Sequence, residues 1–284
     1  MGTETTTPRR PTPSDDPYFY GWRYVPVPKA DGTFSTEQIP LTEADVLHPQ
    51  QDDFIVHNDI HDDITAYLKN AFKWRLAGQP GAMVLHDHRI DWQVEGIEPH
   101  GPDVVVLFEA PPDWDRTRGT YPVLDQGARP ILVVEVTSPS TRSCDLGEKV
   151  SEYYLAGVPR YVIVDVKAVA GRAIIRLLDY RPTSEGPVLV MAKDPTRTWI
   201  PELNLWIAIQ GEGIACLEPD GEAVGNYLEI ARLAEESEAR AAAAEALAQV
   251  ESKRAYAEKA RAEAAEARIR ELEEQLKRRN GSQP

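Results

Sequence analysis

The chain has 284 residues, enough for one domain of ordinary size plus appendages, and 42% of them are hydrophobic. No apolar run reaches the ~18 residues of a membrane-spanning helix, and the first residues lack the apolar core of a secretory signal. The two cysteines, Cys144 and Cys216, are too far apart in sequence for a zinc motif. These features predict a cytoplasmic protein without a membrane contact.

The formal net charge is −15, and it is unevenly distributed. Of the 46 acidic and 31 basic residues, 12 and 11 lie from Glu229 onward, which leaves a net −14 for residues 1–228. Tight nonspecific DNA binding depends on basic surfaces that neutralise phosphates. The charge balance therefore disfavours indiscriminate DNA binding, although it is compatible with a local basic groove.

The N-terminal part of the chain predicts little regular structure. Residues 1–17 are rich in Pro, Thr and Asp, which predicts a disordered arm. Residues 18–50 contain aromatic and proline clusters (YFYGWRYVPVP) that we expect to drape over a core. Within them, TEADVLHP predicts a short helix between an N-cap at Thr42 and a stop at Pro49.

The next segment predicts a long helix followed by strands. Apolar residues recur at helical spacing from Ile60 to Leu76, and Gly78 ends the pattern. The runs AMVLHDHRIDW and DVVVLFEA predict strands, and residues 109–130 predict a loop. ILVVEVT is a continuous, largely β-branched run, typical of a buried central strand.

The pattern of helices and strands continues to residue 228. DLGEKVSEYYLAG predicts a helix with Asp145 as its N-cap, and RYVIVDV predicts another buried strand. AIIRLLDY, PVLVMA and TWIPELNLWIAI predict an antiparallel extension. We therefore predict an α/β domain over residues 18–228, with a mixed sheet flanked by helices.

The last part of the chain predicts a helical tail. Over residues 229–284 the composition shifts to Ala, Glu, Arg and Lys, which is typical of a long C-terminal α-helix or coiled coil. Alanine favours helix but buries little area, so the heptad seam is poor in apolar volume until Ile269, Leu272 and Leu276. Two alternatives stay open: a solvated helix, or weak self-association through these three residues.

Three charged residues lie where they could converge. Asp103 follows Pro102 at the start of a strand, so its side chain lies at an end of the sheet. Glu135 interrupts ILVVEVT, where an unpaired carboxylate is costly to bury, so it must face a cation, a metal or a polar cavity. Lys149 shares a helix face with Asp145 and Tyr153, four residues away on either side. If this face covers the sheet, the ammonium group points toward Glu135.

Two carboxylates and a lysine suit metal-dependent phosphodiester hydrolysis. Mg²⁺ is commonly held by one or two carboxylates, and it polarises the phosphate and lowers the pKa of an attacking water. A lysine can offset charge in the transition state. Each residue also has a structural alternative: a turn for Asp103, an arginine partner for Glu135 and a solvated position for Lys149.

Histidines provide further candidates. His61 begins the first long helix and could lie at the edge of the site, with a helix-cap or surface role as the alternative. His86 and His88 alternate along a predicted strand and would point to one face, but a metal site there lacks a clear third ligand.

The combined pattern resembles the Uma-two family of PD-(D/E)XK nuclease-like proteins. The matching elements are PDVVVLFEA, the E-V-x-S-P-S strand end, the D-x3-K-x3-Y helix and G-V-x-x-Y-x-I-V-D, over roughly residues 42–228. The resemblance implies a restriction-endonuclease-like core that acts on DNA. It implies Asp103 and Glu135 as ligands of Mg²⁺, with Mn²⁺ as an alternative ion, and Lys149 as the catalytic lysine. His61, Asp145 and Tyr153 are secondary candidates.

One departure from the superfamily pattern concerns the lysine. The position two residues after Glu135 is Thr137 instead of Lys, and the resemblance then implies that Lys149 supplies the amine. The leading hypothesis is a Mg²⁺-dependent endonuclease that hydrolyses DNA. The alternative, favoured by the acidic composition and Thr137, is a catalytically inactive interaction protein of the same fold that acts through its helical tail.

Overall fold

The computed structural model describes residues 15–191 and 193–225, together with 240, 249, 253–254, 259, 261, 268–270 and 272–273. Among these residues, no helix is both long and apolar enough to cross a membrane. The arm predicted for residues 1–17 and the tail predicted for residues 229–284 lie outside the described residues, apart from 15–17 and the isolated positions. The domain boundaries and the self-association through the tail therefore stay predictions.

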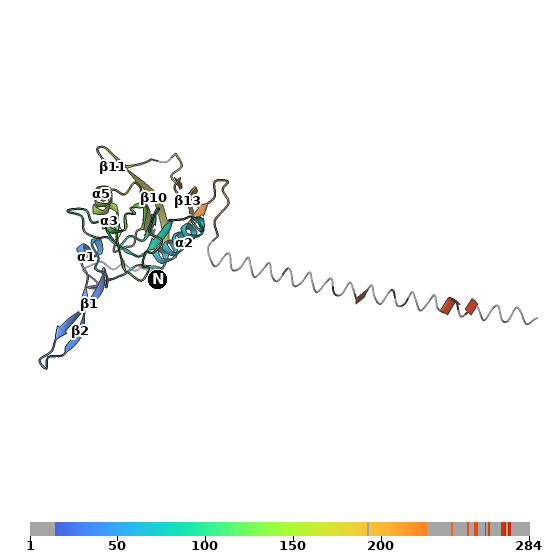
Figure 1. Ribbon diagram of the computed structural model, residues 1–284, viewed down its shortest axis with the longest axis horizontal. Helices are drawn as coiled ribbons and strands as arrows, with labels where there is room; N and C mark the ends of the chain where they lie inside the picture. Colours follow the sequence, from blue (N-terminus) through green and yellow to red (C-terminus); the bar gives the residue numbers. More distant parts are fainter. Residues whose placement is uncertain are drawn as a thin grey trace, which may run out of the picture. The chain divides into compact units, whose positions relative to one another are not determined.

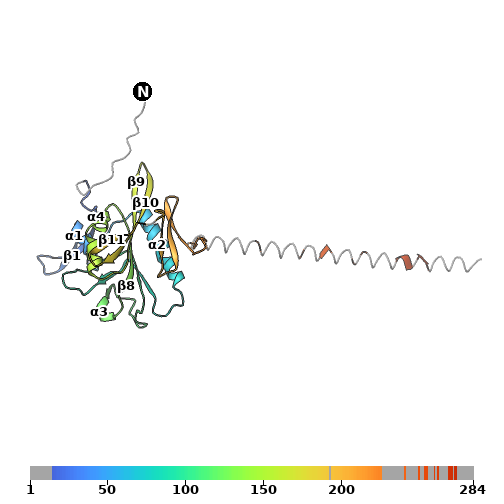
Figure 2. The ribbon, with the colours of Figure 1, turned by 90° about the horizontal axis from the view of Figure 1, so that it is seen from above.

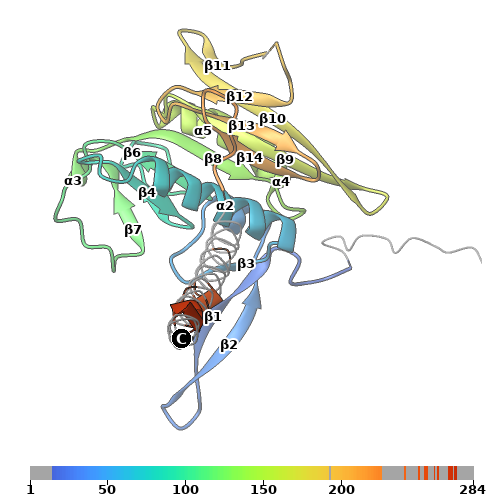
Figure 3. The same cartoon turned by 90° about the vertical axis from the view of Figure 1, so that its right-hand side faces the viewer.

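A six-stranded mixed sheet forms the centre of the domain (Figure 1), with strands in the order β11-β10-β9-β8-β6-β4, which are labelled in Figure 3. These strands are β4 Met83–His86, β6 Val104–Leu107, β8 Pro130–Val136, β9 Tyr161–Val169, β10 Arg172–Thr183 and β11 Gly186–Leu189. β8 and β9 are parallel, and the other neighbours are antiparallel. The predicted α/β fold with a mixed sheet is confirmed, and β8 lies inside the sheet as its apolar sequence predicts.

One face of the central sheet is covered by helix α2, Asp59–Arg75, and by a second sheet. This sheet consists of β12 Arg197–Ile200, β13 Leu205–Gln210 and β14 Gly213–Leu217. Leu68 and Phe72 of α2 pack in one buried cluster with Val134 and Val136 of β8. The predicted antiparallel extension is therefore divided between two sheets, because β12 to β14 are a separate layer.

The helix predicted from Asp145 onward is two helices. α4 covers Arg142–Leu146 and α5 covers Glu148–Leu155. At Gly147, between them, an added Cβ atom would lie only 2.8 Å from the carbonyl oxygen of Ser143. Asp145 is thus a buried residue inside α4, and its prediction as an N-cap is wrong. Figure 2 shows α2 and α4 on opposite sides of the central strands.

The sequence pattern did not predict two further features of the fold: a break within one predicted strand, and a strand and a helix within a predicted loop. The strand predicted over residues 82–92 is interrupted at Asp87, whose φ is 49°, and resumes as β5, Arg89–Asp91. Within the predicted loop at 109–130, β7 (Thr120–Pro122) pairs in parallel with β5 and leads into α3, Val123–Gln126. This pairing joins segments far apart in the chain, so local sequence pattern does not reveal it.

The segment before α2 contains a β-hairpin. β1, Gly21–Pro28, pairs antiparallel with β2, Phe34–Pro40, and β3, Phe54–Ile55, pairs with the start of β1. Figures 1 and 3 show the hairpin extending away from the central sheet, which corrects the prediction that this segment drapes over the core. The short predicted helix is confirmed as α1, Glu43–Leu47, with Thr42 as its N-cap.

A buried arginine joins the two sheets. Arg160 is 2% exposed, and its Nε and Nη2 atoms lie 3.1 and 2.7 Å from the Oδ1 and Oδ2 atoms of Asp179 on β10. The same guanidinium donates to the carbonyl oxygen of Trp199 on β12. This two-point contact holds β10 beside the second sheet.

We expect Arg160→Met to lower the free energy of unfolding by about 3 kcal/mol, because it leaves the buried Asp179 carboxylate with only the Thr198 hydroxyl and the exposed Arg181 as partners among the described residues. Urea unfolding measures the change, and Arg172→Met, at an exposed position of β10, is the matched control. A loss below about 1 kcal/mol for Arg160→Met would contradict a structural role for this contact.

Candidate metal-dependent active site

Asp103 lies where β6 begins, beside the end of β8. The β6–β8 register pairs Val104 with Val134, so Asp103 lies next to the last residues of β8. Its Oδ2 atom accepts a 2.7 Å hydrogen bond from Val136 N, and its own N–H donates to Glu135 Oε2 at 3.0 Å. Each of the two carboxylates that the sequence predicts as ligands therefore accepts a backbone hydrogen bond from the strand segment that carries the other.

Glu135 lies on the face of β8 that α5 covers. Alternation along the strand places its neighbours Val134 and Val136 in the core on the α2 side, so Glu135 faces the other way. Its side chain is 2% exposed. Its Oε1 atom accepts from Lys149 Nζ at 2.9 Å and from the Tyr153 hydroxyl at 2.6 Å. Lys149 is thus the cationic partner that the sequence analysis predicted for the buried carboxylate of Glu135.

Lys149 reaches Glu135 from the first turn of α5. Its Nζ atom also donates to Asp145 Oδ1 at 2.8 Å, across the break between α4 and α5. The three principal candidates, Asp103, Glu135 and Lys149, line one hollow of about 300 Å³. Of the secondary candidates, Asp145 and Tyr153 are bonded directly to this group.

His61 is a buried neighbour of Asp103. Its side chain is 4% exposed, with Nε2 3.1 Å from Asp103 Oδ1 and Nδ1 3.1 Å from Asp62 Oδ1. Burial opposes its protonation, but the charge and hydrogen bond of Asp103 prevail and raise the pKa of His61 to about 9. The surface and cap alternatives for this residue are wrong, since Asn58 is the N-cap of α2.

His57 is a member of the site that sequence reasoning missed. Its ring stacks on that of His61, with centroids 3.8 Å apart, and it lines the same hollow as Asp103. Burial lowers the pKa of His57, and its Nδ1 atom has no hydrogen-bond partner among the described residues. The available signal in the sequence was the H-x3-H spacing of His57 and His61 at the start of α2.

The site contains more buried carboxylates than nearby cations neutralise. Burial raises the pKa of Glu135 to about 8, aided by the charges of Asp103 and Asp145 and opposed by Lys149. The pKa of Lys149 is raised far above its ordinary value: burial opposes this, but the charges of Asp145 and Glu135 prevail. Unneutralised oxygen donors beside a hollow fit a hard divalent cation, because carboxylate oxygens are its preferred ligands.

Thr137 occupies the position of the superfamily lysine but takes no part in the site. Its Oγ1 atom accepts from Val166 N at 2.8 Å and lies 3.3 Å from Asp165 Oδ1. Asp165 itself is held by Arg142 and Arg176. Thr137 therefore belongs to a structural network between the end of β8 and β9.

His86 and His88 do not share a strand face. β4 ends at His86, and the positive φ of Asp87 separates the two residues. Among the described residues, neither belongs to a group of three ligand atoms close enough to hold an ion. The two-His metal site considered from sequence is not formed.

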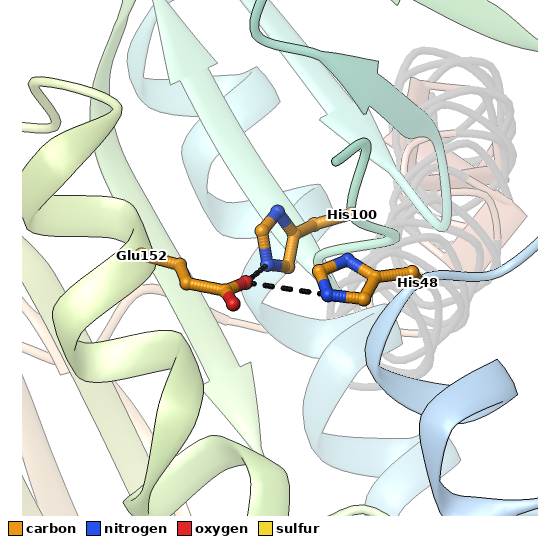
Figure 4. A group of neighbouring side chains, drawn as sticks. All are labelled: His48, His100 and Glu152. Atoms are coloured by element: carbon orange, nitrogen blue, oxygen red, sulfur yellow. Dashed lines mark hydrogen bonds and ion pairs between the residues drawn. The ribbon is translucent and has the colours of Figure 1, made fainter. Parts of the chain in front are cut away.

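Two carboxylate–histidine groups among the described residues have ligand atoms within 4.8 Å of one another: His57, His61 and Asp103, and a second group of His48, His100 and Glu152 (Figure 4). Glu152 Oε2 is 2.6 Å from His100 Nε2 and 3.6 Å from His48 Nε2. Trp92 Nε1 donates to His100 Nδ1 at 2.7 Å, so the neutral ring carries its proton on Nε2 and donates it to Glu152. Because Nε2 is protonated, His100 is a poor metal ligand. The group instead ties the segment before Asp103 to α5.

We expect Glu135→Gln to stabilise the metal-free protein increasingly as pH rises. The folded-state pKa of about 8 lies above the ordinary 4.5, so the wild type loses stability as pH rises through this window. The loss is at most about 1.4 kcal/mol per pH unit, and the amide does not titrate. Urea unfolding with a chelator at several pH values measures it. Glu148→Gln, on the exposed side of α5, should show the wild-type profile, and parallel profiles for all three proteins would contradict the raised pKa.

Comparison with known proteins identifies the family. No curated protein matches the chain. One similar solved structure is described as "a putative nuclease belonging to DUF820 from Anabaena variabilis ATCC 29413", at 12% identity, with 61% of this chain and 80% of that chain covered and a TM-score of 0.37. A family model described as "Putative restriction endonuclease" matches residues 49–192. Since this match spans half of the length of the chain, the chain belongs to the Uma2 family.

Proposed function

We propose that the protein is an endonuclease that hydrolyses DNA phosphodiester bonds with Mg²⁺, or with Mn²⁺ in its place. The observation that carries the proposal is the convergence of Asp103, Glu135 and Lys149 on one hollow, in a chain whose family model is described as "Putative restriction endonuclease". Fold alone would not support an activity, but this donor set has the chemistry that phosphodiester hydrolysis needs.

Asp103 and Glu135 are the proposed metal ligands. The Oδ1 atom of Asp103 and the Oε2 atom of Glu135 each have one hydrogen bond in the described structure, so each retains a lone pair for an ion. A bound divalent ion supplies a Lewis acid for the phosphate and lowers the pKa of a coordinated water. Binding should release the proton of Glu135, because only the carboxylate is a strong ligand.

Lys149 is the proposed catalytic lysine. Two of its three N–H groups are engaged by Glu135 and Asp145, and the third has no partner among the described residues. Because Lys149 lines the hollow, this N–H can donate to the attacking water or to a phosphate oxygen. Its raised pKa keeps it protonated, so it stabilises negative charge and does not act as a general base.

Three other residues position this set. Tyr153 and Asp145 fix Glu135 and Lys149 by direct hydrogen bonds. His61 donates to Asp103 Oδ1 and, as a cation, stabilises its ionised form. Burial and hydrogen bonding of these partners limit the freedom of the reacting groups before substrate binds, which lowers the entropic cost of reaction.

Plasmid cleavage in Mg²⁺ and in Mn²⁺ tests the proposal. We expect nicking or linearisation by the wild type, none with a chelator, and a loss of at least about 10³-fold in Asp103→Asn and Glu135→Gln, since each amide removes a ligand charge while preserving shape. Glu148→Gln, one residue before Lys149 but exposed, should retain activity.

Two results would contradict the proposal. The first is wild-type cleavage that persists unchanged in the Asp103→Asn and Glu135→Gln proteins, which would locate the activity elsewhere or in a contaminant. The second is absence of cleavage of every DNA form tested, supercoiled, linear and single-stranded, in both metals by correctly folded wild-type protein.

A further inference from the structure

A hollow beside the candidate active site is lined by cations. Its volume is about 210 Å³, and Lys69, Lys73, His86, His88 and Arg116 contribute to its wall together with Met83, Val84, Leu85 and Trp114. Among the residues that the structure describes, no acidic one lines this hollow. In a chain with a net charge of −15, such a local excess of basic groups is not explained by composition.

The cations of this basic hollow are not used to stabilise the described fold. Lys69 and Lys73 are one turn apart on α2, a spacing at which like charges repel. Burial and the charges of Lys69 and Arg116 lower the pKa of Lys73. Among the described residues, Lys69, Lys73 and Arg116 form no ion pair. By contrast, Arg75, which also lies on α2, pairs with Glu218. Keeping unpaired like charges together costs stability, and an anionic ligand bound at this hollow would offset the repulsion.

The basic hollow adjoins the candidate active site. His88 lines both hollows. The active-site hollow contains the carboxylates of Asp53, Asp87, Asp103 and Glu135. The charged residues that line the two hollows therefore change at His88 from a set dominated by carboxylates, with Arg89 and Lys149 among them, to a set of cations. An acidic pocket suits a metal ion, and the adjacent basic pocket suits the anions on either side of the bond to be cut.

We propose that Lys69, Lys73 and Arg116 bind backbone phosphates of a nucleic-acid strand whose scissile phosphate lies at Asp103 and Glu135. This inference rests on the proposed function for the position of the scissile bond. Lysine and arginine at a groove neutralise phosphates without reading sequence, so the site fixes the strand's course and not its sequence. The acidic remainder of the domain repels DNA and confines binding to the basic hollow and the adjoining active-site hollow.

The test compares Lys69→Gln/Lys73→Gln with the matched control Lys167→Gln/Arg172→Gln, which removes the same charge at exposed positions of β9 and β10. Binding of the full-length proteins to a labelled DNA duplex is measured with a chelator present, so that no cleavage occurs, over a range of salt concentrations. Thermal unfolding confirms that each variant is folded, and Arg116→Gln provides an independent variant.

We expect the double Lys variant to bind about 10- to 100-fold more weakly at 0.1 M salt and to reduce the slope of log K against log salt by about 2, with Arg116→Gln reducing it by about 1. The control should match the wild type. Equal affinities and slopes in all proteins, or no binding of DNA by the wild type, would overturn the inference. Displacement of DNA by polyglutamate at equal charge concentration would also overturn it, since the site would then be a general acidic-polymer site.

The two proposals fail separately. Lost binding in the Lys variant without cleavage by the wild type would support the phosphate site and contradict the nuclease. Wild-type cleavage with unaltered binding in the Lys variant would support the nuclease and place the DNA elsewhere.

Discussion

The contact between Glu135 and Lys149 determines how the site is built. A carboxylate inside a central strand is tolerated only with a partner, and the ammonium group of Lys149 lies 2.9 Å away, supported by Asp145 and Tyr153. To bring Lys149 over β8, the chain breaks its helix at Gly147 and packs α5 against the sheet. The ion pair between Lys149 and Glu135 thus helps to fix the position of α5 on the sheet.

The same helix is fastened to the other metal-ligand candidate. His100 lies three residues before Asp103 and donates to Glu152 on α5, while Trp92 fixes its tautomer. The hydrogen bond from His100 to Glu152 therefore ties the segment that leads to Asp103 to the helix that carries Lys149. Such a frame resists drift of the carboxylates when an ion binds or leaves, which is the preorganisation that a hydrolytic site requires.

Sequence predicted those parts of the site that local pattern encodes. A carboxylate in an apolar run identified Glu135, and helical spacing alone grouped Asp145, Lys149 and Tyr153. It did not predict His57, whose role depends on stacking with His61, or the pairing of β5 with β7, which joins distant segments. The basic hollow was equally hidden, because α2, β4 and the loop carrying Arg116 meet only in the fold.

We propose that the carboxylates of Asp103 and Glu135 together bind one divalent cation. Anomalous diffraction from crystals soaked in Mn²⁺ tests this site, since the ion is located without reference to activity. We expect a peak about 2.0–2.3 Å from oxygen atoms of both residues, absent in Asp103→Asn crystals. A peak confined to the His48–His100–Glu152 group, or none in the active-site hollow at saturating Mn²⁺, would contradict it.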